Sequence, residues 1–459
     1  MNLGHPFKDL SGIDMLFTRD FTAAELAGRR REIAGKIGED AHLLIASAPA
    51  MPGDDLVQDA NFYYFCGLEL CHAYLLVSGR DGRSTLFLSS RENMVGAAED
   101  KLGFEDADRV RQCLQFDEVL PVSALTAALA GVRKLYWPHS EMEAAGVTRF
   151  GANGVARLCE EAEWDRAEPR NKRMLRLLAE RCPQVEIADA LPLIMVMRTI
   201  KSAAEIEVMR QAGQLSANVM IASMQATRPG VTENRLQAIA EYIFRDQGHC
   251  APGYGIIAAS GQNIWNGHYH RNNGTLHDGD VVLMDCGPDL RHYSSDIARI
   301  WPVSGTFSDW HRRVYGMISQ YHKTLLELIK PGALEADIYE EAARRMLALC
   351  SAPGSPYARE LPLVEQMIAR KVGYINHAVG LSVHDSVDRS WREQPLRPGF
   401  VCVVDPMVWC EPERQYIRVE DTIVITDDGC ERLTGAAPYD IAEIEAVMAA
   451  SRRSSSILP

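Results

Sequence analysis

The chain has 459 residues, of which 47% are hydrophobic and 24% charged, and its formal net charge is −14. A chain of this length exceeds what one hydrophobic core usually organises, so we expect two domains. The acidic charge argues against a protein that tracks nucleic-acid phosphates, and the sequence has no run of about 18 apolar residues that could cross a membrane. We therefore expect a globular protein with neither nucleic acid nor membrane as a partner.

The N-terminal segment and the cysteines indicate a cytoplasmic protein. Residues Met1–Phe17 mix polar and apolar side chains and lack the basic start and apolar run of a secretory signal. Eleven cysteines are scattered along the chain without the spacing of a zinc motif. Reduced and mostly buried thiols are the expected state in the cytoplasm.

The first half alternates short β-like runs with helical segments. A charge-rich helix is expected near Glu25–Lys36, and the charge-rich stretch Ala144–Ala188 predicts one or two more helices. Four apolar runs predict strands: Ala41–Ala46, Ala73–Val77, Ser84–Leu88 and Lys134–Trp137. We interpret residues 1–192 as an N-terminal α/β domain.

A second domain, residues 193–459, follows a boundary near Leu191 to Ser202. Ser202 and Glu205 form a capping box, in which each side chain satisfies a free amide at the start of a helix. Apolar residues then recur every three or four positions, as on the buried face of an amphipathic helix. Further helices are expected at Thr232–Gln247, Trp310–Ile329 and Ala336–Cys350.

Strand signals dominate the rest of this second domain. Apolar runs predict strands at Val281–Met284, Ser295–Ile300, Val401–Val404 and Tyr416–Ile425. Helices combined with hairpin-linked strands indicate an α+β domain, with helices on one side of a curved antiparallel sheet.

Carboxylates lie at the ends of these apolar strands. Asp285 and Asp405 each follow four apolar residues, where a charge is costly unless it is paired or binds a metal. Glu420 lies within a strand, and strand alternation places it on the same face as Arg418. For Glu420 alone, an ion pair with Arg418 on a solvated edge would be a sufficient explanation, but three such carboxylates favour a metal site.

Two further residues complete a metal-binding set. A hairpin would bring Asp285 and Asp296 onto facing strands, where like charges need a cation or a shared proton. His377 adds a nitrogen ligand. Four carboxylates and one histidine form a mostly hard ligand set, which suits Mn²⁺ best and also admits Co²⁺, Zn²⁺ or Fe²⁺. A ligand charge near −4 matches two divalent ions better than one.

The segments around these residues resemble the pita-bread metallopeptidases, the family of aminopeptidase P, prolidase, methionine aminopeptidase and the metal-free creatinase. Residues 61–68, Asn-Phe-Tyr-Tyr-Phe-Cys-Gly-Leu, resemble the N-terminal domain of aminopeptidase P, which methionine aminopeptidase lacks. The resemblance implies a curved antiparallel sheet covered by helices, preceded by the smaller α/β domain. The segments of the second domain that carry it are Asp285–Gly287, Tyr293–Arg299, His377–Asp385, Leu396–Pro406 and Ile417–Asp421.

The resemblance also implies roles for particular residues and an activity. His268 and His384 would orient a peptide substrate, Arg418 would lie beside the last metal ligand, and Asp405 would relay a proton to the leaving nitrogen. The activity implied is removal of an N-terminal residue that precedes proline, by a protein that is a homodimer or homotetramer. The implied ligands of the two metal ions are Asp285, Asp296, His377, Asp405 and Glu420.

Four single positions and one short segment depart from the family pattern and leave alternatives open. The family has glutamate at Asp405, threonines at Ala298 and Ile300, and histidine at Gly373. The segment Tyr269–Asn272 reads Tyr-His-Arg-Asn, where the family has Tyr-Thr-Glu-Asn. A prolidase-like dipeptidase or an atypical hydrolase is one alternative. A metal-poor, non-catalytic binder of peptides or small molecules is the other.

Overall fold

The computed structural model describes residues 18–49, 57–91, 102–370 and 375–451. The N-terminal segment Met1–Phe17 and Gly373, both considered above, lie outside the described residues. The chain forms two compact units, residues 1–198 and 199–459. The boundary expected near residue 192 falls within helix α7 (Leu191–Thr199).

The N-terminal unit is built on a six-stranded mixed sheet with the strand order β4-β3-β2-β1-β5-β6. Its central pairs β1–β2 and β2–β3 are antiparallel, whereas β3–β4, β1–β5 and β5–β6 are parallel. The strands are β1 (Ala41–Ala46), β2 (Tyr74–Ser78), β3 (Ser84–Leu88), β4 (Glu118–Pro121), β5 (Lys134–Trp137) and β6 (Glu186–Asp189). The helices are α1 (Ala23–Ile37), α2 (Ala60–Cys66), α3 (Ala107–Leu114), α4 (Leu125–Ala128), α5 (Arg149–Glu161) and α6 (Arg170–Arg181).

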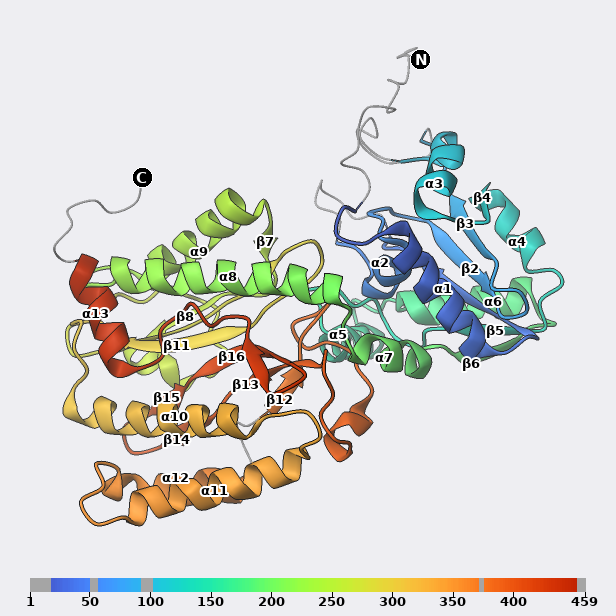
Figure 1. Ribbon diagram of the computed structural model, residues 1–459. Coiled ribbons are helices and arrows are strands. Elements are labelled where there is room, and N and C mark those ends of the chain that lie inside the picture. The colour runs from blue at the N-terminus through green and yellow to red at the C-terminus, as the bar shows by residue number, and fades with distance from the viewer. Residues whose placement is uncertain (1–17, 50–56, 92–101, 371–374, 452–459) are drawn as a thin grey trace. The chain divides into compact units, whose positions relative to one another are not determined.

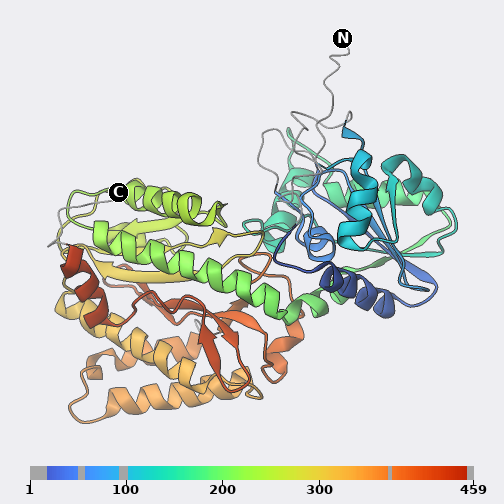
Figure 2. The ribbon, with the colours of Figure 1, turned by 45° about the horizontal axis from the view of Figure 1, so that its top comes forward.

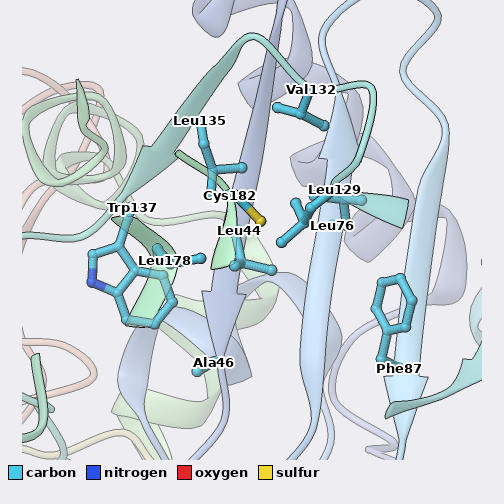
Figure 3. Packing of buried hydrophobic residues seen from close by; sticks show 10 residues of the cluster. All are labelled: Leu44, Ala46, Leu76, Phe87, Leu129, Val132, Leu135, Trp137, Leu178 and Cys182. Carbon is cyan, nitrogen blue, oxygen red and sulfur yellow. The ribbon is translucent and has the colours of Figure 1, made fainter. Parts of the chain in front are cut away.

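A hydrophobic cluster packs helix α6 against this sheet. Leu44 on β1, Leu76 on β2 and Trp137 on β5 are buried together with Leu178 of α6 (Figure 3). The stretch Ala144–Ala188, which the sequence placed only as helical, contains α5, α6 and the edge strand β6. The four strands expected from apolar runs are confirmed, but β4 and β6 are short and half-exposed and carry no comparable apolar signal.

The C-terminal unit contains a seven-stranded antiparallel sheet with the order β12-β13-β16-β11-β9-β8, in which β17 also pairs with β16. Two small two-stranded sheets, β10–β7 and β14–β15, accompany it. The strands are β7 (Ala251–Pro252), β8 (Ile257–Ser260), β9 (Val281–Asp285), β10 (Pro288–Asp289), β11 (Ile297–Pro302), β12 (Ile375–Ala378), β13 (Val401–Val404), β14 (Met407–Cys410), β15 (Gln415–Arg418), β16 (Glu420–Ile425) and β17 (Cys430–Arg432).

Helices α8, α9 and α10 run beside this sheet (Figures 1 and 2). The capping box that starts α8 is present, since Ser202 Oγ accepts from the Glu205 amide and the Glu205 carboxylate accepts from the Ser202 amide. Within the described residues, no helix is both long and apolar enough to span a membrane. The helices are α8 (Ala203–Ala226), α9 (Glu233–Gly248), α10 (Asp309–Leu328), α11 (Glu335–Ser351), α12 (Leu361–Arg370) and α13 (Ile441–Ser451).

The prediction of one continuous strand over Tyr416–Ile425 is wrong. The segment forms two strands, β15 and β16, which belong to different sheets and are separated at Val419. β15 pairs with β14, and β16 lies between β13 and β11. The apolar alternation continues through the break because both strands are buried, so the pattern alone does not reveal it.

Candidate metal centre

Neighbouring strands of the curved sheet bring the predicted carboxylates together. Asp285 is the last residue of β9, Asp296 immediately precedes β11, and Glu420 is the first residue of β16. In the strand register, Ala298 lies opposite Asp285 on one side and opposite Glu420 on the other. Residues directly opposite each other in antiparallel strands share a face, so Asp285, Ala298 and Glu420 point to the same side of the sheet.

The connection from β9 to β11 depends on a glycine. A Cβ atom added to Gly287 would lie 1.9 Å from the carbonyl oxygen of Ser295, so only glycine permits this close approach. Thr422 fixes the backbone of Asp296 from the other side. Its Oγ1 accepts from the amide of Asp296 and donates to the carbonyl oxygen of Asp296, each at 2.8 Å. These contacts hold Asp296 beside Asp285.

Asp285, Asp296 and Glu420 form the first metal-capable group. All three are buried, and each offers an oxygen atom within 4.8 Å of the other two. The hydroxyl of Tyr254 lies 2.6 Å from Asp296 Oδ1 and 2.9 Å from Asp285 Oδ1. A hydroxyl has one proton, so it satisfies only one of these two acceptors at a time.

Arg418 is the one side-chain cation that contacts these carboxylates in the described part of the chain. Its Nη1 donates to Asp285 Oδ2 at 3.0 Å, and its Nη2 lies 2.5 Å from Glu420 Oε2. Arg418 thus pairs with three buried carboxylates, those of Asp285, Asp405 and Glu420, and the buried Asp296 adds a fourth to the cluster. Buried charges are stable only when they are paired or bound to metal. One guanidinium does not balance four carboxylates, so the site can accept additional positive charge.

Two carboxyl pKa values reflect this crowding. Burial, reinforced by repulsion from Asp296, raises the pKa of Asp285 to about 7 despite the attraction of Arg418. Burial likewise raises the pKa of Asp405 to about 7 against the attraction of Arg418. The pKa of Glu420 is raised well above its usual range, first by burial. Without a metal, the cluster therefore retains protons near neutral pH.

Glu420 provides the test of whether these residues fit a metal ion. Both of its carboxylate oxygens are buried and neither makes a hydrogen bond to the described residues; Oε2 has only the ion-pair contact with Arg418. Its cross-strand neighbour Ala298 has no polar atom that could serve. A buried carboxylate without hydrogen bonds is costly, and a divalent cation held by oxygen ligands would satisfy it. The residues therefore fit a metal ion.

Asp405 is arranged differently from the other carboxylates. Arg418 donates to it twice, from Nε to Oδ1 at 2.9 Å and from Nη2 to Oδ2 at 2.7 Å. Asn376 Nδ2 also donates to Asp405 Oδ2, at 3.2 Å. Among the described residues Asp405 belongs to neither metal-capable group. The structure thus brings four of the five predicted ligands into such groups and places the fifth against Arg418.

Asp296, His377 and His384 form the second metal-capable group. His377 Nε2 lies 3.4 Å from Asp296 Oδ2, and the rings of His377 and His384 are 3.9 Å apart at their centroids. Burial lowers the pKa of His377 to about 4. Burial and then the neighbouring His377 lower the pKa of His384 to about 4, and the exposed His268 contributes to the same shift. The predicted histidines therefore gather at one side of the carboxylates.

Two polar residues of this site were missed by the sequence analysis. Tyr254 lies between Gly253 and Gly255, outside any regular strand, and no periodic pattern indicates that its hydroxyl reaches two carboxylates. Asn376 precedes His377 in β12, and its contact with Asp405 depends on the pairing of β12 with β13. The sequence offered one signal for Asn376, namely that a polar residue directly precedes the candidate ligand His377.

Comparison with known proteins agrees with this geometry. Residues 207–427 match the model of metallopeptidase family M24. The Xaa-Pro aminopeptidase of Escherichia coli is 29% identical over 95% of this chain and 99% of that protein. The mitochondrial intermediate cleaving peptidase 55 of Arabidopsis thaliana is 27% identical over 92% of this chain and 82% of that protein.

Solved structures agree as well. Aminopeptidase P from Escherichia coli with the inhibitor Pro-Leu matches with a TM-score of 0.74 and 27% identity, over 95% of this chain and all of that one. The expected fold, an antiparallel curved sheet with helices preceded by a smaller α/β unit, is thereby confirmed. The chain is an enzyme of the metallo-aminopeptidase type: its residues 207–427 match metallopeptidase family M24, and most of its length is similar to Xaa-Pro aminopeptidases.

Proposed function

We propose that this enzyme removes the N-terminal residue from peptides that have proline at the second position, using two divalent metal ions. The observation that carries the metal dependence is the cluster of four buried carboxylates, of which three pair with the guanidinium of Arg418 and one, Glu420, makes no hydrogen bond within the described residues. The preference for proline is supported by relatives named Xaa-Pro aminopeptidase, one of them in a solved structure with the inhibitor Pro-Leu.

The metal ligands would be Asp285, Asp296, His377 and Glu420, with Asp405 as the fifth position of the family pattern. Bound divalent ions would polarise the peptide carbonyl and lower the pKa of a water molecule, so that it attacks at neutral pH. The carboxylates favour Mn²⁺, because hard oxygen ligands suit that ion.

Protein side chains would carry out the proton transfer and stabilise the substrate carbonyl. Asp405 has a pKa of about 7 and is held in one orientation by Arg418. A group with this pKa can take up a proton and pass it to the leaving nitrogen at neutral pH. His268, on the exposed side, would donate to the carbonyl oxygen of the substrate and stabilise the charge that develops there.

Product analysis tests the specificity. The enzyme, loaded with Mn²⁺, is incubated with Xaa-Pro-Yaa tripeptides, with Xaa-Pro dipeptides and with Xaa-Ala-Yaa tripeptides as the matched control. Release of free Xaa from Xaa-Pro-Yaa alone is expected. Cleavage of the dipeptide alone would indicate a prolidase-like enzyme, and equal cleavage of the proline and alanine tripeptides would contradict the preference for proline.

A second specificity is favoured by one relative. The Arabidopsis thaliana protein is named for intermediate cleavage, without reference to proline. A longer peptide without proline, added as a fourth substrate to the same assay, tests this activity, and release of its first residue alone would identify it.

A further inference from the structure

Asp405 makes different contacts from the other three carboxylates. Both of its oxygens accept hydrogen bonds from Arg418, and Oδ2 also accepts one from Asn376. Each oxygen keeps a second lone pair, but these hydrogen bonds, two of them charge-assisted, hold the Asp405 carboxylate against the guanidinium. Asp405 is also one methylene shorter than glutamate, which withdraws its oxygens by about 1.5 Å. The side of the site that contains His377 therefore lacks one oxygen ligand.

His384 is placed to fill that position. It offers a ring nitrogen within 4.8 Å of ligand atoms of both Asp296 and His377. Its side chain is exposed and makes no hydrogen bond to other described residues, so it can turn toward an ion at little cost. Ligand atoms about 2.0–2.1 Å from a tetrahedral ion are about 3.3 Å from one another, and His377 Nε2 already lies 3.4 Å from Asp296 Oδ2.

The tautomer of His377 supports a cation between these groups. Its Nδ1 lies 3.1 Å from the carbonyl oxygen of Ala378, a partner that can only accept, so the proton resides on Nδ1. Nε2 then presents a lone pair to a carboxylate oxygen of Asp296. Two acceptors that face each other need a proton or a cation between them, and an outer carbonyl that fixes the tautomer is typical of metal-bound histidines.

The loop that carries His384 is fixed in place. The next residue, Asp385, forms a buried ion pair with Lys201, with 2.9 Å between Oδ2 and Nζ. The amide of Asp385 also donates to the carbonyl oxygen of Ala378 at 2.9 Å. A Cβ atom on Gly380 would lie 2.4 Å from the Asp385 carboxylate, so the loop is closely packed. The position of His384 beside His377 is thus built into the fold.

We propose that Asp296, His377 and His384 form a two-histidine metal site in this enzyme, in which His384 takes the ligand position that Asp405 leaves when it pairs with Arg418. The proposal rests on the metal dependence proposed above and is independent of the preference for proline. Two imidazoles favour Zn²⁺ or Co²⁺ over Mn²⁺ at this half of the site, whereas Asp285, Asp296 and Glu420 remain an all-oxygen half. The two ions would then differ in preferred metal.

Cobalt substitution tests this assignment without reference to activity. The full-length protein is stripped of metal with a chelator and titrated with Co²⁺, and bound cobalt is measured by elemental analysis. Proton NMR then counts the imidazole N–H resonances that the paramagnetic ion shifts. Two such resonances are expected, and His384→Asn should remove one of them. The same variant should weaken binding of the second ion by at least ~10–100-fold, which is the typical cost of losing a residue that only hydrogen-bonds to a metal ligand.

Three further variants separate the proposal from its alternatives. His277→Asn, at another exposed histidine, and Asp405→Asn should both retain two resonances and two ions. In the double variant Asp405→Glu/His384→Asn, the longer carboxylate should restore the second ion. A single resonance in the cobalt-loaded protein, unaffected by His384→Asn, would overturn the proposal, as would loss of the second ion in Asp405→Asn. Failure to bind cobalt at all would overturn the metal dependence as well.

Discussion

The guanidinium of Arg418 binds both oxygens of Asp405, from Nε at 2.9 Å and from Nη2 at 2.7 Å, and also reaches Asp285 through Nη1. This arrangement places Asp405 against a cation of the protein itself, while Glu420 has an ion-pair contact with the same guanidinium but no hydrogen bond within the described residues. The balance between Arg418 and the metal ions therefore decides how the site behaves.

Lengthening the side chain at position 405 should increase activity. In Asp405→Glu the carboxylate would extend about 1.5 Å further toward the other ligands. Because a misplacement of about 1 Å can cost roughly 100-fold in rate, we expect kcat/KM for a Xaa-Pro-Yaa peptide to rise by about 10- to 100-fold. Steady-state kinetics with saturating Mn²⁺ measure this. The exposed change Asp427→Glu is the control, and an unchanged or lower kcat/KM for Asp405→Glu would contradict the interpretation.

Removal of Arg418 should destabilise the metal-free protein. Arg418→Met leaves several buried carboxylates without their cation, and breaking a buried pair in this way typically costs about 3–5 kcal/mol. Denaturant unfolding of the chelated protein measures the loss, with Arg397→Met as an exposed control. Saturating metal should reduce the difference, because bound cations replace the lost charge. Identical unfolding midpoints without metal would refute the role of Arg418.

Metal binding should release protons below neutral pH. The pKa values of Asp285 and Asp405 are raised to about 7, so both groups are largely protonated at pH 6 and ionised at pH 8 in the metal-free protein. Ions displace these protons, so metal affinity should fall as the pH decreases through 7, and proton release should disappear above about pH 8. Calorimetric titration in buffers of different ionisation enthalpy measures the release. Absence of proton release at pH 6 would be inconsistent with the raised pKa values.

A hydroxyl at position 298 should strengthen metal binding. Ala298 lies opposite both Asp285 and Glu420, so Ala298→Thr would provide a hydrogen-bond donor to the oxygens of Glu420. Outer partners of metal ligands are typically worth ~10–100-fold in affinity, and we expect a gain of about 10-fold in competition titrations. Ala298→Val has the same shape without the hydroxyl and should show no gain. Equal affinities of the threonine and valine variants would exclude this explanation.

Much of the fold followed from apolar patterns, which reflect burial directly. The strand that ends at Asp285 and the strand that precedes Asp405 were visible because a charged residue terminates each apolar run. The break at Val419 was not, because apolar residues continue through it into a second sheet.

The contacts of the site depended on information that the sequence pattern does not contain. Strand alternation placed Arg418 beside Glu420, but the reach of Arg418 to Asp405 follows from the pairing of β14 with β15. Tyr254 joins Asp285 and Asp296 from an irregular segment, where no periodic signal exists. Side-chain partners across irregular segments are fixed by tertiary packing, so they became visible only in the structure.

The most direct test of metal-dependent peptide cleavage combines elemental analysis with a product assay on one sample. The protein is stripped with a chelator, divided, and reconstituted with Mn²⁺, Co²⁺ or Zn²⁺, and free N-terminal residue is measured after incubation with a Xaa-Pro-Yaa peptide. We predict two bound ions per chain, no release of the residue from the stripped protein, and recovery of release on reconstitution. Equal release by the stripped and reconstituted samples, or the absence of tightly bound metal, would contradict the account.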